Sequence, residues 1–304
     1  MASRVVDAVM PGHRLVSVTP AYAAFTNSVQ VLDTLSPAGS RLRLVVKRMT
    51  DDPDPERAAA DFHGLRIARK HGIPAPEPVL LDTTGELLGV PGIVTTLAEG
   101  TQNANPSDPK AWAQDIAELL LRIHDVRLDA YDRRHIYDGN ELALYFLSGE
   151  YPERMAGHPL SDTIYDAIRE LRGSLVADRP VFLHMDFWPG NILWLGGRIS
   201  AVVDWDASGY GDPAIDVGYF RMDAYLRGIK EAAQPFLEYY EASSGPVRNL
   251  GYWELARAAA PLPDPAAWIP EPGDLGDLVV PVERAHTDYY EFVHDALRRA
   301  YAGR

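Results

Sequence analysis

The chain has 304 residues, of which 46% are hydrophobic, and this is enough for two lobes with cores of their own. Its 43 acidic residues outnumber the 29 basic ones and give a net charge of −14, so we expect no binding to nucleic acid through the phosphate backbone. The sequence contains no cysteine, which excludes disulfides, thiolate metal sites and cysteine nucleophiles.

Hydropathy argues against a membrane location. No apolar run reaches the roughly 20 residues that a membrane-spanning helix needs. The N-terminal segment carries Arg4, Asp7 and Arg14 without a long apolar run, so no secretory signal is expected. These features predict a cytoplasmic protein that does not bind membranes.

Runs of β-branched residues between positions 15 and 49 predict a small antiparallel sheet. Two of the runs, SVQVLDTL and LRLVVKRM, are separated by the turn sequence SPAGS. Lys47 lies in the last run beside Val46, where a charge that faced the core would be costly unless it were paired. Lys47 is either an ordinary edge-strand lysine or one that is held in place for function, and its position in the strand favours the second.

Helical periodicity follows over positions 54–71, where Gly72 and Pro74 end the pattern. Its expected apolar stripe consists of Phe62, Leu65, Ile67 and Ala68. Two strands around a turn are predicted between positions 76 and 98. Further amphipathic helices are predicted at 107–124, with Ser107 as the cap, and at 161–175.

The segment 181–216 contains two short apolar runs, VFLH and ISAVV, which are typical of buried strands. Between them the sequence DFWPGN predicts a tight loop with Asp186 and Asn191 at its two ends, and Asp204 follows the second run. We expect these three oxygen-bearing side chains to lie close together. Such a set suits phosphoryl transfer, in which one carboxylate orients the attacking hydroxyl while an amide oxygen and a second carboxylate bind Mg²⁺.

The last third of the chain is predicted to be mostly helical, at about 215–229, 231–243, 250–260 and 281–302. Asp216 is expected to be a buried N-cap of the first of these helices. The proline-rich and glycine-rich residues 261–280 predict a surface loop. Aromatic and acidic residues are interspersed in this region, which suits either a pocket for a cationic or sugar-like molecule or a core with a solvated face.

The residues of the 181–216 segment match a known pattern at several offsets. The matching positions are Leu183, His184, Asp186, Asn191 and Leu193, then Asp204-Trp205-Asp206, then Gly211-Asp212-Pro213 and Asp216. This order resembles the aminoglycoside phosphotransferase and choline kinase family, which has a protein-kinase-like fold. The resemblance implies a two-lobed α+β fold, with a small antiparallel sheet in an N-terminal nucleotide-binding lobe (1–98) and a mainly helical catalytic and substrate-binding lobe (99–304).

The resemblance also implies roles for individual residues. Asp186 would be the catalytic base, and Asn191 and Asp204 would bind Mg²⁺. Lys47 would contact the α and β phosphates of ATP, or of GTP. Counting back from Ile73-Pro74 places the acidic partner of Lys47 at Asp61, with Glu56 as the alternative.

For the rest of the nucleotide, the resemblance implies backbone contacts to the adenine from the carbonyl of Thr96 and the N–H of Ala98. The segment TPAYAAFTNS stands where protein kinases have a glycine-rich loop, and it contains no glycine. Backbone N–H groups near Thr26, Asn27 or Ser28 would then contact the phosphates, and Asn27 matches the family's Ser/Asn turn.

These features predict an ATP-dependent kinase of small molecules. It would transfer the γ-phosphate to a hydroxyl of an aminoglycoside-like antibiotic or a related amine or sugar metabolite, including choline-like amines, and act as a monomer or homodimer. A protein kinase is disfavoured because Met185 replaces the usual arginine and too few residues separate Asp204 from Asp216 for an activation loop. The alternative from another class is a non-catalytic nucleotide-binding module.

Overall fold

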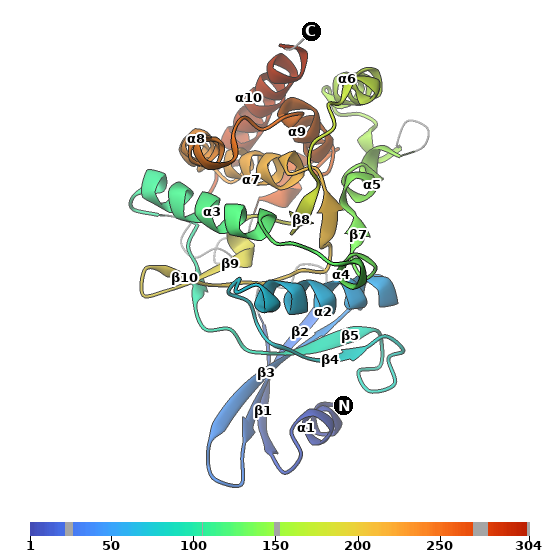
Figure 1. Ribbon diagram of the computed structural model, residues 1–304, viewed down its shortest axis with the longest axis vertical. Helices are drawn as coiled ribbons and strands as arrows, with labels where there is room; N and C mark the ends of the chain where they lie inside the picture. The colour runs from blue at the N-terminus through green and yellow to red at the C-terminus, as the bar shows by residue number, and fades with distance from the viewer. Residues whose placement is uncertain (22–26, 105, 149–152, 270–278, 303–304) are drawn as a thin grey trace. The chain divides into compact units, whose positions relative to one another are not determined.

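The computed structural model describes residues 1–21, 27–104, 106–148, 153–269 and 279–302. The chain forms two compact units (Figure 1). Unit 1 consists of Met1–Thr101, Asp129–Ile136 and Ile192–Ser208. Unit 2 consists of Gln102–Leu128, Tyr137–Asn191 and Gly209–Arg304. Within the described residues no helix is long and apolar enough to cross a membrane.

Unit 1 is built on a five-stranded antiparallel sheet with the strand order β1-β2-β3-β5-β4. Its strands are β1 (Arg14–Pro20), β2 (Ser28–Leu35), β3 (Arg41–Arg48), β4 (Pro78–Asp82) and β5 (Gly92–Thr96). This is the sheet predicted over 15–49, completed by the two strands predicted between 76 and 98. Lys47 in β3 pairs with Val29 on one side and Ile93 on the other, so it lies on a central strand and not at an edge.

The two faces of this sheet have different partners because side chains alternate along a strand. On one face, Leu44 and Val46 of β3 pack with Val5 and Val6 of α1 (Ala2–Val9), which lies beside the sheet in Figure 1. Helix α1 was not predicted, because its eight residues are too few for a clear helical period. Lys47 projects from the other face, away from this apolar core.

Helix α2 (Pro55–Lys70) packs against β4 and β5 and has the predicted extent. The Asp54 side chain caps it by accepting the N–H of Glu56 at 2.8 Å. The predicted apolar stripe is wrong in one respect, because Phe62 is only half-buried while its neighbours Asp61 and His63 are buried. The helix therefore presents polar groups to the interior of unit 1.

One glycine of α2 allows a close approach. A Cβ on Gly64 would lie 2.8 Å from the Cβ of Trp205 and 2.7 Å from the hydroxyl of Ser208, so a larger residue would displace the 204–208 segment. This segment follows the hairpin of β9 (Ile192–Leu195) and β10 (Arg198–Val202), along which β6 (Thr101–Gln102) is the third strand. Gly64 therefore lets Asp204 and Asp206 lie against α2.

His63 on α2 faces the short helix α4 (Ala130–Arg133), which also belongs to unit 1. Its ring stacks on that of His135 with centroids 4.0 Å apart. Burial lowers the pKa of His63 to about 4, and the charges of His135 and Arg66 act in the same direction. Asp132 acts in the opposite direction.

This lowered pKa predicts a loss of stability in mild acid. The unfolded chain binds a proton at His63 near pH 6.5 while the folded chain does so only near pH 4, so stability falls as the pH drops through that window. We expect the thermal midpoint to fall less between about pH 7.5 and 5 in His63→Phe than in the wild type, because phenylalanine keeps the stack without titrating. His71→Phe, at an exposed position, is the control, and an unchanged pH dependence in His63→Phe would contradict the expectation.

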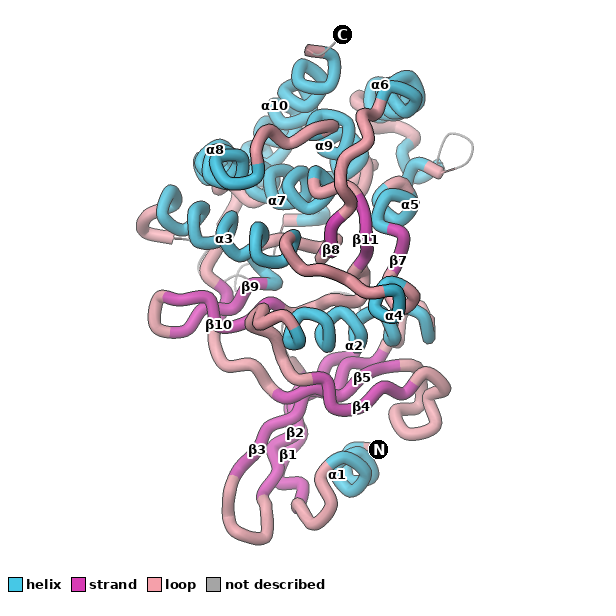
Figure 2. The backbone as a smooth tube through the Cα atoms, in the orientation of Figure 1, coloured by secondary structure: helices cyan, strands magenta, loops and turns pink. Residues whose placement is uncertain are grey.

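Unit 2 contains short strands and most of the helices (Figure 2). Its three-stranded sheet has the order β7-β11-β8, with β7 (Tyr137–Asp138), β8 (Val181–Leu183) and β11 (Gly209–Gly211). The predicted strand VFLH is therefore β8, and its partner is β11. The other predicted run, ISAVV, falls in β10 and pairs with β9, a strand that was not predicted.

The helices predicted for unit 2 are present with small shifts at their ends. They are α3 (Pro109–His124), α6 (Ser161–Leu171), α7 (Ala214–Leu226), α8 (Ala233–Ser244), α9 (Leu250–Ala258) and α10 (Val282–Tyr301). The short α5 (Gly139–Ala143) was not predicted. Asp108, and not Ser107, caps α3 by accepting two backbone N–H groups at 3.1 Å.

Two further expectations for this region need correction. Asp216 is not an N-cap but lies inside the first turn of α7, and Asp212 accepts the N–H of Ala214 there. The predicted surface loop 261–280 begins with buried residues, including Leu262, and contains a short helical turn at Pro265–Trp268. Positions 270–278 lie outside the described residues.

Candidate active site

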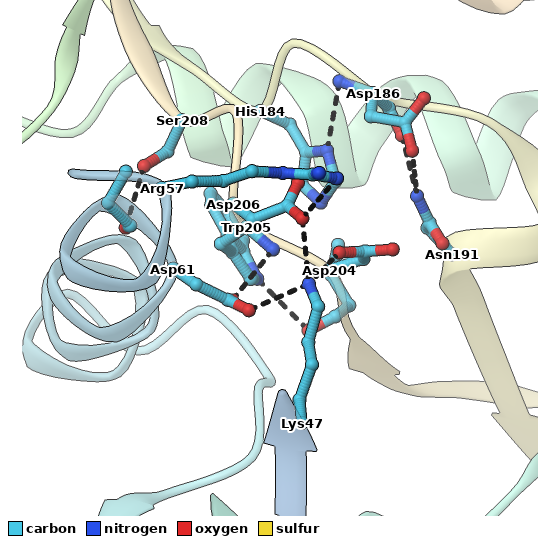
Figure 3. A network of polar contacts seen from close by, with 12 residues as sticks. Lys47, Arg57, Asp61, His184, Asp186, Asn191, Asp204, Trp205, Asp206 and Ser208 are labelled. Atoms are coloured by element: carbon cyan, nitrogen blue, oxygen red, sulfur yellow. Dashed lines mark hydrogen bonds and ion pairs between the residues drawn. The ribbon is translucent and has the colours of Figure 1, made fainter. Parts of the chain in front are cut away.

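The ammonium group of Lys47 is surrounded by three carboxylates within unit 1 (Figure 3). Its Nζ donates to Asp61 Oδ2 at 2.8 Å, to Asp206 Oδ2 at 3.0 Å and to Asp204 Oδ1. We call these four residues the Lys47 cluster. A lysine has three N–H donors, so each donor has its own carboxylate. Asp61, and not Glu56, is the partner from α2.

The members of the cluster differ in exposure. The Asp61 and Asp206 side chains are 2% and 8% exposed, while that of Asp204 is 39% exposed. Arg57 supplies a second cation through an ion pair with Asp206 at 2.8 Å. Asp204 is therefore the carboxylate of the cluster that a bound ligand can reach most readily.

The cluster shifts the pKa values of its members. Burial alone would lower the pKa of Lys47, but Asp204, Asp206 and Asp61 raise it well above 10.5, so the ammonium keeps its charge. Burial raises the pKa of Asp61 above 3.8, against the opposite effect of Lys47. For Asp206, the charges of Lys47 and Arg57 outweigh burial and lower the pKa.

Local backbone structure brings both aspartates of the 204–206 segment to Lys47. Asp204 has a φ of 67°, a left-handed conformation that is strained for a residue other than glycine. The N–H of Trp205 donates to Asp61 Oδ1 at 3.1 Å, so Asp61 holds this segment with one oxygen and Lys47 with the other. The strain is thus offset by contacts with α2.

Asp186 and Asn191 form a second polar group, within unit 2. Asn191 Nδ2 donates to Asp186 Oδ2 at 2.8 Å and to the Asp186 carbonyl at 2.9 Å (Figure 3). The other carboxylate oxygen, Oδ1, accepts a hydrogen bond from the hydroxyl of Tyr219. The ring of Trp188 covers Gly190, where a Cβ would lie 2.0 Å from the indole. The 186–191 loop is therefore tightly packed.

Asp216 supports the start of this loop. It is fully buried and accepts the N–H of His184 at 2.8 Å and that of Met185 at 2.7 Å. Burial opposes ionisation, but hydrogen bonding and charge from His124 and His184 lower the pKa of Asp216 below 3.8. Met185 has a φ of 71°, so the residue before Asp186 is also strained and is held in place by Asp216.

The residues predicted to contact the adenine and phosphates lie in unit 1. Thr96 ends β5, and its N–H donates to the Glu77 carbonyl at 2.9 Å. Ala98, two residues further along, is half-buried, and its N–H donates no hydrogen bond to another described residue. Asn27 directly precedes β2 and is also half-buried, whereas Thr26 lies outside the described residues.

The structure thus brings Lys47, Asp61 and Asp204 together in unit 1, and Asp186 and Asn191 together in unit 2. Among the residues described, no three His, Asp or Glu side chains form a ready-made metal site. Mg²⁺ takes one or two protein oxygens and completes its shell with waters and phosphates, so each residue is considered by itself. Asp204 of unit 1 is accessible, and the side-chain hydrogen bonds of Asn191 in unit 2 use its amide nitrogen, so each residue has an oxygen atom of the kind that Mg²⁺ prefers.

No role was predicted from the sequence for Arg57, Tyr219 or Arg257. Asp206 shares a face with Asp204 in extended chain, and the resemblance favoured Asp204 for the metal; the structure shows that Asp206 also contacts Lys47. Tyr219 lies three residues after Asp216 on α7, and such residues share a helix face. For Arg57 and Arg257 no sequence signal existed, since each meets its partners only through tertiary packing.

The chain is similar to a known protein family and to several solved structures. The family model of the phosphotransferase enzyme family matches residues 24–259. None of the curated proteins gives a significant match. Among solved structures, a proposed aminoglycoside phosphotransferase from Ralstonia eutropha is similar, with 14% identity, a TM-score of 0.67 and coverage of 98% of each chain.

Two other solved structures have the same fold. The aminoglycoside phosphotransferase APH(4)-Ia, in a ternary complex with AMP-PNP and hygromycin B, has 15% identity, a TM-score of 0.62 and coverage of 99% of each chain. Choline kinase LicA from Streptococcus pneumoniae has 15% identity and a TM-score of 0.57, with 99% of this chain and 96% of that chain covered. The predicted α+β kinase-like fold is confirmed. Because the family model spans more than half of the sequence, the chain belongs to the phosphotransferase enzyme family.

Proposed function

We propose that the protein is an ATP-dependent kinase of small molecules that transfers the γ-phosphate to a hydroxyl group. The observation that carries this proposal is the Lys47 cluster. A buried ammonium with three carboxylates is costly to desolvate, and a kinase needs such a charge beside the triphosphate. Membership of the phosphotransferase family supports the same conclusion.

Each residue then has a role. Lys47, oriented by Asp61, contacts the α and β phosphates. The carbonyl of Thr96 and the N–H of Ala98 bind the adenine, and backbone groups near Asn27 cover the phosphates. We therefore propose that residues 1–98 bind the nucleotide and that residues 99–304 serve catalysis and acceptor binding.

For catalysis, Asp186 orients the acceptor hydroxyl and accepts its proton as the oxygen–phosphorus bond forms and ADP leaves. Asn191 and Asp204 would hold Mg²⁺, which would neutralise charge on the phosphates. Lys47 has no spare N–H in the free protein, because all three contact carboxylates. Asp204, the exposed one, would exchange Lys47 for the metal, so metal and nucleotide should bind cooperatively.

This coupling gives a test by ligand-induced stabilisation. Mg²⁺ and ATP together should raise the thermal midpoint. At a hundredfold excess over the dissociation constant, binding adds about 2.7 kcal/mol to the free energy of unfolding. ATP in the presence of a chelator should stabilise the protein much less. The double substitution Asn191→Ala with Asp204→Ala should remove the metal-dependent part, whereas Glu77→Gln, at an exposed ion pair, should retain it. If ATP shifts the wild-type midpoint neither with nor without Mg²⁺, the proposed function is wrong.

For the acceptor, we propose an aminoglycoside-like antibiotic or a related amine or sugar, with a role in antibiotic resistance in the first case. A protein that uses ATP in this way would act in the cytoplasm, as a monomer or homodimer. Mixing the enzyme and Mg²⁺–ATP with aminoglycosides, choline analogues and sugars, and measuring ADP release, identifies the class. Asp186→Asn supplies the background rate for each compound.

A further inference from the structure

The side chain of Tyr219 contacts the proposed catalytic base directly. It projects from α7, is 4% exposed, and its hydroxyl donates to Asp186 Oδ1. Burial and the nearby Asp186 raise the pKa of Tyr219 well above 10, so the hydroxyl keeps its proton and remains a donor. Asn191 donates to the other oxygen at 2.8 Å. Each oxygen of Asp186 therefore has a donor of its own.

Arg257 of α9 holds Tyr219 from the other side. Its guanidinium carbon lies 3.8 Å from the centroid of the Tyr219 ring, a cation–π contact between buried groups. Its Nη2 donates to the carbonyl of Met185 at 3.2 Å. Since Met185 also donates its N–H to Asp216, both backbone polar groups of this strained residue are held.

These contacts form a closed ring. It runs from Asp186 to Tyr219, to Arg257, to Met185 and back along the chain to Asp186. The same face of α7 carries Asp216 and Asp223, and Asp223 binds Arg227, whose guanidinium stacks 3.8 Å from the Trp188 ring. One helix face thus holds successive residues of the 184–191 segment.

We propose that Tyr219 and Arg257 are positioning residues that fix the Asp186 carboxylate in the orientation that receives the acceptor hydroxyl, an inference that rests on the proposed function. The terminal torsion of an aspartate has a broad energy profile, so a single donor on one oxygen leaves it free to turn. Donors on both oxygens prevent that rotation. Each carboxylate oxygen has two lone pairs, so Oδ1 can accept from Tyr219 and from an acceptor hydroxyl together.

The test compares Tyr219→Phe with Tyr225→Phe. The first removes only the hydroxyl and keeps the ring beneath Arg257. Tyr225 also lies on α7, but its hydroxyl donates to the carboxylate of Asp295 at 3.4 Å and not to the 186–191 loop, and Tyr225→Phe removes only that hydroxyl. In Tyr219→Phe we expect kcat for ADP release to fall roughly 10-fold to 100-fold with KM for ATP unchanged, because only orientation is lost. Water serves as the acceptor where the compound panel gives none.

Hydrogen exchange of the peptide 184–191 provides a readout that needs no turnover. It should be about threefold faster in Tyr219→Phe than in the wild type or Tyr225→Phe. Arg257→Lys keeps the charge but loses the planar stack on the Tyr219 ring. It should show the same fall in kcat and the same faster exchange, so it provides a second test if Tyr219→Phe folds poorly. If the peptide 184–191 exchanges in Tyr219→Phe at the wild-type rate, or if kcat of Tyr219→Phe in an active enzyme stays within twofold of wild type, Tyr219 does not position Asp186. A wild-type protein that releases no ADP under any condition would instead overturn the proposed function.

Discussion

Replacing Asp186 should lower turnover by roughly 10² to 10⁴-fold, the usual contribution of a positioned general base. The loss should be nearly the same in Asp186→Ala and Asp186→Asn, since neither side chain can accept a proton from the acceptor. The two variants should differ in stability. Asparagine keeps one oxygen that can accept from the buried Tyr219 hydroxyl, although its amide nitrogen then faces the Asn191 donor, whereas alanine leaves the Tyr219 hydroxyl unsatisfied at a cost of about 1–3 kcal/mol.

The measurement is steady-state ADP release at saturating Mg²⁺–ATP, together with the thermal midpoint of each variant. Asp166→Asn, an exposed position on α6, is the matched control and should turn over like the wild type. Wild-type activity in a well-folded Asp186→Asn protein would show that another group takes the proton.

Replacing Lys47 with methionine should lower the free energy of unfolding by about 3–5 kcal/mol, more than the replacement of Asp186, and should abolish nucleotide binding. The substitution removes the cation between Asp61, Asp206 and Asp204 and leaves buried carboxylates facing one another. Urea unfolding at neutral pH measures the first effect, and the Mg²⁺–ATP thermal shift measures the second. Lys110→Met, at an exposed position, should change stability by no more than about 0.5 kcal/mol.

The same variant should show a distinctive pH dependence. Burial already raises the pKa of Asp61 above 3.8, and loss of Lys47 removes the main opposing influence and raises it further. A carboxyl whose folded-state pKa is raised adds stability that is fully present below its unfolded pKa and is lost as the pH rises through the folded pKa. The deficit of Lys47→Met relative to the wild type should therefore be greatest at neutral pH and shrink towards pH 4. An equal deficit at both pH values would contradict the account of the cluster.

Much of the fold could be predicted from local sequence patterns. Strand runs with period two gave the sheet that carries Lys47, and helical periods gave α2, α3 and α6 to α10 within a few residues. Local signals failed where two neighbouring residues could play the same part, as when Asp108 capped α3 in place of Ser107. They also failed for α1, which is short and becomes helical by burying Val5 and Val6 against the sheet.

The family of the protein and its polar residues could be predicted because the offsets from His184 to Asp216 are set along the chain. How these residues are held depends on tertiary contacts. Asp61 rather than Glu56 reaches Lys47, Asp206 joins the cluster, and Tyr219 and Arg257 brace Asp186. Such contacts join residues far apart in the sequence. They depend on helix rotation, close approach at Gly64 and the left-handed backbone of Met185 and Asp204, none of which has a local signature.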